Sequence, residues 1–211
     1  MKALVPLLLL PPVLAGCAGR GEIDPTTGGV SAVRSACPVV GVPAGTGDVT
    51  LFTGAGQDAA GIDVVAAMTE VRSTCAEVGD QISTAVTFRV DARRASAGGA
   101  RDVDLPFYIA VVRGGSNVVA KRVSGVRVHF DDGQLRASAP GQATATVARA
   151  AATIPADIRN RITRRRRAGE EDAAVDPLSQ PEIRQAVNRA SFEALVGFQL
   201  TDAQLRYNAQ R

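Results

Sequence analysis

Between residues 36 and 153 the sequence repeatedly alternates apolar and polar residues, and this period of two is that of a β-strand with one buried face. The clearest run covers residues 82–93. One face of that strand would carry Ile82, Thr84, Val86, Phe88 and Val90, and the other Ser83, Thr87, Arg89, Asp91 and Arg93. Val126–Phe130 alternates in the same way, and further candidate strands cover residues 49–52, 62–78, 103–113, 118–123 and 142–148. The pattern predicts a mainly β domain over residues 36–153.

Short turns divide these strands. Gly98–Gly99, Gly114–Asn117 and Asp131–Gln134 all supply residues that tolerate a positive φ. About seven short strands separated by such turns are typical of an antiparallel, Ig-like β-sandwich. Aromatic residues make up only 4% of the 211-residue chain, so we expect a core of Val, Ala and Ile in one domain with tails.

The last third of the sequence changes to a helical pattern. Residues 155–168 are consistent with a short helix, with Pro155 near its first turn. Ser179–Glu182 has the form of a capping box, and apolar residues at helical spacing then predict a helix over 182–197: Ile183, Val187, Ala190, Ala194, Leu195 and Phe198. Thr201–Gln204 is a second capping box, before a helix over 202–209. We therefore expect residues 154–211 to form a helical extension packed on the sandwich.

The first residues have the features of an export signal. Lys2 supplies one positive charge, an apolar run follows, and small residues lead up to Cys17. The run is shorter than the roughly 20 residues that span a bilayer, and three prolines interrupt it, Pro6, Pro11 and Pro12. Residues 1–16 are therefore predicted to be a signal peptide.

The four residues Leu14-Ala15-Gly16-Cys17 resemble the lipobox of bacterial lipoproteins. The resemblance implies cleavage before Cys17, transfer of diacylglycerol to its thiol, and acylation of the new amine by a fatty acid such as palmitate. Two or more acyl chains anchor a protein stably in a membrane, whereas one gives marginal binding. The alternative is an ordinary signal peptide in which Cys17 is incidental.

The residues after the lipobox indicate the membrane in which the protein is anchored. Ala18 stands where inner-membrane lipoproteins of Gram-negative bacteria carry Asp, so the resemblance implies the outer membrane, facing the periplasm. Residues 17–35 are rich in Gly and show no apolar period, which predicts a lipidated cysteine followed by a flexible tether. The chain as a whole resembles Gram-negative envelope lipoproteins, and that likeness implies location only.

Two cysteines remain once Cys17 is assigned to lipid. In an exported protein the pair Cys37 and Cys75 predicts a disulfide that ties the first strand to a later one. The alternative, a metal site or a catalytic thiol, is disfavoured because the chain has one His and no C-x-x-C spacing.

Two motifs near residue 60 suggest ligand binding. Gly54–Ala59 matches G-x-G-x-x-A, the phosphate-binding turn of dinucleotide folds, but that turn needs a following helix and then a parallel strand. The strand pattern downstream favours a plain glycine-rich loop. Asp58 and Asp63 lack the regular carboxylate spacing of a calcium loop, so a turn is the favoured interpretation there too.

No catalytic set stands out. His129, the one histidine, falls on the polar side of a predicted strand beside Asp131 and Asp132, and the sequence identifies no nucleophile for it. We therefore expect neither an enzyme nor a bound metal or cofactor.

The most unusual local feature is a basic cluster, Arg164–Arg167, preceded by Arg161 and followed by Glu170, Glu171 and Asp172. One interpretation is that these acids neutralise the cluster on a solvated surface. Alternatively, Arg161 and Arg164, Arg165, Arg166 and Arg167 form an anion-binding patch for lipid headgroups, lipopolysaccharide phosphates or an acidic partner. Nucleic acid is not expected, because aromatic residues are absent from the cluster and the net charge is only +3.

Three hypotheses follow. The leading one is a lipid-anchored cell-envelope lipoprotein whose sandwich is a non-catalytic binding or assembly module for another envelope protein. The second is a structural or transport lipoprotein that contacts anionic lipid or glycan through the arginine cluster. The third is an envelope hydrolase.

Overall fold

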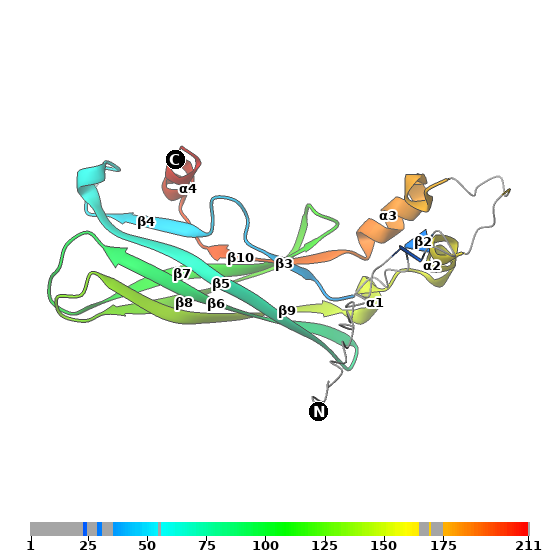
Figure 1. Cartoon of the computed structure of the whole chain (residues 1–211), viewed down its shortest axis with the longest axis horizontal. Coiled ribbons are helices and arrows are strands. Elements are labelled where there is room, and N and C mark those ends of the chain that lie inside the picture. The colour runs from blue at the N-terminus through cyan, green and yellow to red at the C-terminus, as the bar shows by residue number, and fades with distance from the viewer. Residues whose placement is uncertain are drawn as a thin grey trace, which may run out of the picture.

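The computed structural model describes residues 23–24, 29–30, 36–54, 56–164, 169 and 175–210. Most of these residues form two four-stranded sheets (Figure 1). The first sheet contains, in order, β3 (Val39–Gly41), β10 (Phe192–Phe198), β7 (Arg101–Arg113) and β8 (Asn117–Phe130). The second contains β4 (Asp48–Phe52), β5 (Ile62–Val78), β6 (Gln81–Arg94) and β9 (Arg136–Ala148).

Most strand pairs are antiparallel. Within the described ranges, β3 and β10 are the only parallel pair. A separate short pair joins β1 (Ile23–Asp24) to β2 (Gly29–Val30). The prediction of a mainly β, sandwich-like fold is confirmed, and the two predicted strands at 118–123 and 126–130 are one strand, β8.

The core lies between the sheets, as the alternation predicted. Every residue that was assigned to the apolar face of the run over 82–93 is buried: Ile82, Thr84, Val86, Phe88 and Val90. They meet apolar side chains of the first sheet, and Phe88 packs edge-on against Phe107 of β7 with ring centroids 5.0 Å apart. The inner face of β9 carries mostly Ala and Gly. Gly141 is required there, because a Cβ would come within 2.2 Å of the Phe88 ring.

A buried guanidinium fastens the loops at one end of the sandwich. Arg94 donates hydrogen bonds to the backbone carbonyls of Gly98 and Gly99 in one loop and of Asp131 and Gln134 in the next. Its guanidinium also lies over the Phe130 ring, 5.4 Å from the centroid. These contacts satisfy a buried charge without a carboxylate, since every hydrogen-bond partner is a main-chain oxygen.

The helices are short and occupy two places (Figure 1). One group lies at one end of the sandwich: α1 (Arg149–Ala152), α2 (Ala156–Thr163) and α3 (Pro181–Arg189), with the 3₁₀ turn η2 (Pro177–Ser179). Helices α2 and α3 pack together around Ile158, Ile183 and Ala186. The last helix, α4 (Asp202–Ala209), packs on β4, where Tyr207 meets the Phe52 ring edge-on at 5.0 Å.

Two expectations for the C-terminal third are wrong. The helix predicted over 182–197 ends at Arg189, and residues 192–198 form β10, between β3 and β7. The apolar residues of this segment fit both periods, and pairing on two sides outweighed the helical pattern. The capping box at Ser179 does not form, because the Ser179 hydroxyl donates to the Asp176 carbonyl and Gln180 precedes the helix.

Two other expectations for that region are confirmed. The box at Thr201 forms with Gln204 and begins α4, as predicted. Helix α2 lies within the predicted range 155–168, with Pro155 immediately before it.

Candidate functional site

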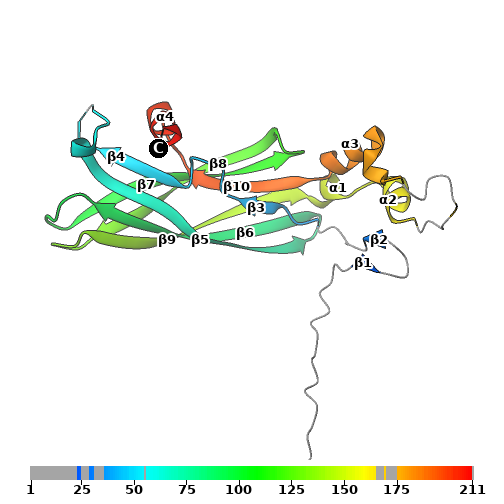
Figure 2. The same ribbon diagram turned by 45° about the horizontal axis from the view of Figure 1, so that its top comes forward.

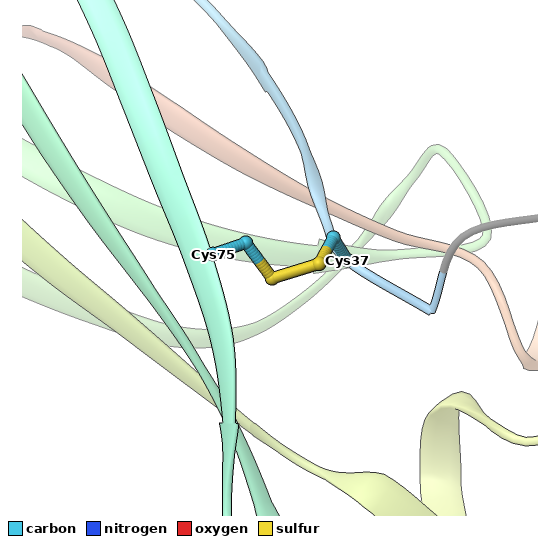
Figure 3. Close-up of a disulfide and its surroundings, with 2 residues drawn as sticks. All are labelled: Cys37 and Cys75. Carbon is cyan, nitrogen blue, oxygen red and sulfur yellow. A yellow bond between two sulfur atoms is a disulfide. The ribbon is translucent and has the colours of Figure 1, made fainter.

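The predicted disulfide is present. Cys37, just before β3, is bonded to Cys75 of β5, with the two Cα atoms 6.1 Å apart (Figure 3). Because β3 belongs to the first sheet and β5 to the second, the bond connects the two layers.

Other predicted N-terminal features lie outside the described residues, namely the signal peptide, the lipobox with Cys17 and most of the tether. Among the helices that the structure describes, none is long and apolar enough to cross a membrane.

The arginine cluster is placed only in part. Arg161 of α2 forms an ion pair with Glu182 at 3.1 Å and donates a hydrogen bond to the Gln180 side chain at 2.7 Å. These contacts fasten α2 to the start of α3. Arg164 follows α2 and is exposed, while Arg165, Arg166 and Arg167 lie outside the described residues.

His129 lies between two carboxylates on the exposed face of β8. Its Nδ1 is 2.6 Å from Asp102 Oδ1, and its Nε2 is 3.4 Å from Asp131 Oδ1. The hydrogen bond to Asp102 raises the pKa of His129, and the negative charges of both aspartates add to this effect. In the described chain no hydroxyl or thiol is hydrogen-bonded to the imidazole, so the arrangement lacks the nucleophile of a catalytic triad.

The motifs near residue 60 form a turn. Gly54–Ala59 leads into a 3₁₀ turn, η1 (Ala59–Gly61), and then directly into strand β5, so the helix that a dinucleotide site needs is replaced by a strand. Asp58 accepts a hydrogen bond from the Gly61 amide at 2.8 Å. Asp63 pairs with Arg101 at 2.6 Å. No cluster of three metal-ligating side chains occurs among the residues described.

The surface that best fits a binding function was missed by the sequence reasoning: the exposed half of β8, residues 117–125. Every residue of this half is exposed, although it pairs with β7 along its length. Val118, Val119 and Val123 leave 58%, 49% and 56% of their surface in solvent. Figure 2 shows the β7–β8 hairpin projecting away from the sheet that contains β5, β6 and β9.

The register explains why this half of β8 leaves the core. Ser124 and Arg122 stand opposite Phe107 and Ile109 of β7, on the face that turns toward the second sheet. Polar residues thus occupy core positions at Arg122 and Ser124, whereas Val126, Val128 and Phe130 fill the equivalent positions later in the strand. This change from polar to apolar residues at the inward positions is the sequence signal that could have identified the surface.

A cleft opens where the two edge strands β8 and β9 diverge. It has a volume of about 440 Å³. Its floor includes Val86, Phe107 and Ile109, and its rim carries Arg122 and Gln142. Thr87, Ser124 and Thr144 also line the cleft, so it offers hydrogen-bonding groups beside the apolar ones.

The exposed half of β8 is also basic. It carries Lys121 and Arg122, and the whole strand contains no acidic residue. The Lys121 ammonium lies over the Tyr108 ring at 4.6 Å from the centroid, which orients its charge on the outer face of the sheet. Together the exposed valines, the cleft and the two cations form one continuous candidate binding surface.

No known protein family matches the chain, and no curated protein is similar to it.

Proposed function

We propose that this protein is a lipid-anchored lipoprotein of a bacterial cell envelope, attached through Cys17 to the periplasmic face of the outer membrane. The lipobox supports the anchor. The Cys37–Cys75 disulfide supports export, because disulfides persist in oxidising compartments and are rare in the cytosol. In this proposal the sandwich is a non-catalytic binding or assembly module.

The exposed half of β8 is the observation that carries the binding function. In the described part of the chain β8 pairs with β7 on one edge only, so the main-chain groups of its other edge have no strand partner. An extended segment that adds to such an edge gains main-chain hydrogen bonds, and its side chains enter neighbouring pockets. The β8–β9 cleft is such a pocket.

We propose an extended, acidic segment of an envelope protein as the occupant. Lys121 and Arg122 complement acidic side chains. The same two cations disfavour a second copy of this chain, because two β8 edges together would place like charges side by side.

An Ig-like arrangement is part of the proposal. It is supported by two four-stranded sheets and by the antiparallel pairing of most strands.

The anchor is tested with Cys17→Ser. We expect the variant to move from the membrane fraction to the soluble periplasmic fraction and to lose labelling by radioactive palmitate. The double variant Cys37→Ser/Cys75→Ser is the matched control, and its remaining cysteine should keep it labelled and membrane-bound. A Cys17→Ser protein that stays in the membrane would disprove the anchor.

The binding surface is tested by placing a photo-crosslinking amino acid at Val118 in intact cells, with Thr146, an exposed residue of β9, as the control position. We expect one protein adduct from position 118, its loss in Lys121→Glu/Arg122→Glu, and no such adduct from position 146. In the reconstituted complex the amides of residues 117–125 should be protected from hydrogen exchange. Equal crosslinking at both positions, or no protection, would contradict strand addition.

The second candidate function is contact with anionic lipid or glycan through the arginine cluster. Its support is the exposed position of Arg164 at the end of α2. Replacing Arg164, Arg165, Arg166 and Arg167 with Gln should abolish binding to anionic liposomes if this function is correct.

A further inference from the structure

The outer face of the second sheet contains a hollow with a volume of about 760 Å³. Three strands line it: β5 with Val65 and Ala67, β6 with Arg89, Asp91 and Arg93, and β9 with Arg136 and Ser138. Small side chains form much of its floor, so the guanidinium groups around it have room for a ligand between them.

Two of these arginines face each other. Arg93 and Arg136 are Cα partners in the β6–β9 register, and both are exposed. Like charges directly opposite on neighbouring strands destabilise a sheet. Within the described ranges, neither side chain has a hydrogen bond or an ion pair, so no described carboxylate is paired with either guanidinium.

The nearby acids are engaged by other arginines. Arg89 pairs with Asp91 at 2.8 Å and with Glu70 at 2.7 Å. The hydrogen bonds from Arg89 and Thr69 lower the pKa of Asp91, so this carboxylate stays ionised and paired. Asp63, at the start of β5, is held by Arg101 through both carboxylate oxygens, at 2.6 and 3.2 Å.

We propose that Arg93 and Arg136 bind a phosphate monoester in this hollow. Guanidinium groups bind phosphate oxygens through paired hydrogen bonds of fixed geometry. The two positive charges match the charge of about −1.5 to −2 that a phosphate monoester carries near pH 7. The hollow is larger than a single phosphate group, which leaves space for the alcohol that carries it.

The site is separate from the surface proposed above. The hollow lies on the outer face of the second sheet, whereas the exposed half of β8 belongs to the first. Its ligand could be a soluble phosphate ester or the headgroup of a phospholipid, and these share the chemistry that the arginines recognise. Aromatic side chains are absent from its lining, so base stacking does not contribute.

The test uses the full-length chain in nonionic detergent micelles and measures binding by calorimetry with three probes: inorganic phosphate, glycerol 1-phosphate, and phosphatidic acid mixed into the micelles. We expect Arg93→Gln/Arg136→Gln to weaken binding at least about tenfold, as for the loss of charge-assisted hydrogen bonds. The matched control is Arg184→Gln/Arg206→Gln, which removes the same charge from exposed positions on α3 and α4. It should bind like the unaltered chain.

The outcomes separate the sources of the ligand. Binding of phosphatidic acid but not of glycerol 1-phosphate supports a lipid headgroup, and similar binding of both supports a soluble ester. Absence of binding by all three probes, or equal loss in the two double variants, would overturn the proposal.

Thermal unfolding provides a second measurement: without phosphate, Arg136→Gln should not lower the Tm, because it removes a repulsion. A lowered Tm would also count against the site.

Discussion

The two halves of β8 differ in burial although they belong to one continuous strand. From Val126 to Phe130 every second side chain is buried in the core, while from Asn117 to Gly125 all residues are exposed. Both halves pair with β7. The difference therefore comes from the second sheet, which covers only the later half. Main-chain hydrogen bonding to the buried strand β7 is enough to extend β8 into solvent. The extended half of β8 presents a surface although it has no hydrophobic core of its own.

The largest expected effect comes from creating a cavity beneath the buried half of β8. Phe130→Ala should lower the free energy of unfolding by about 5 kcal/mol, because it leaves a cavity and removes the ring beneath Arg94. Chemical denaturation measures this change. Val123→Ala in the exposed half is the control, and we expect it to change stability by less than about 0.5 kcal/mol. Similar losses in the two variants would show that the exposed half is covered in solution.

Removing the disulfide tests whether the amides of the two halves of β8 exchange with solvent by different routes. Cys37→Ser/Cys75→Ser removes a crosslink between two residues 38 positions apart in the sequence. In the chain-entropy model this should lower the free energy of unfolding by about 4 kcal/mol. Those amides of the buried half that donate hydrogen bonds to β7 should exchange with solvent by global unfolding, so their exchange should become about a thousandfold faster. Amides of residues 117–125 should change little, because they exchange by local opening. Hydrogen exchange read by mass spectrometry measures both, and a uniform acceleration would contradict the distinction.

The smallest effect concerns His129 in the buried half, whose imidazole points to the solvent side. Since Asp102 raises its pKa, Asp102→Asn should lower that pKa toward the ordinary value of about 6.5. The stabilisation by protonated His129 is complete below the unfolded pKa and is lost as the pH rises through the raised folded pKa. Asp102→Asn should therefore reduce stability at low pH but not above the folded pKa. Because the chain has one histidine, its proton NMR titration is unambiguous. An unchanged titration would mean that Asp102 does not hold the ring.

Much of the strand content could be predicted because the period of two is local. Strand β5 has the predicted bounds, Ile62–Val78, and the burial of the run over 82–93 follows the predicted faces. The binding surface could not be predicted in this way. Its exposure depends on how far the second sheet extends over β8, and the pairing of Arg93 with Arg136 depends on the register of two strands about 40 residues apart in the chain.

By itself, the sequence determined most of the long strands, the turns between them, the cap of α4 and the pairing of Cys37 with Cys75. Each of these depends on neighbours within a few residues or on the small number of available partners. The tertiary structure alone decided that residues 192–198 become a strand. The apolar pattern of that segment fits a helix and a strand equally well. It becomes a strand because its main-chain groups pair with β3 on one side and β7 on the other. Contacts between distant segments settle such a choice, because local preferences amount to only a fraction of a kcal/mol per residue.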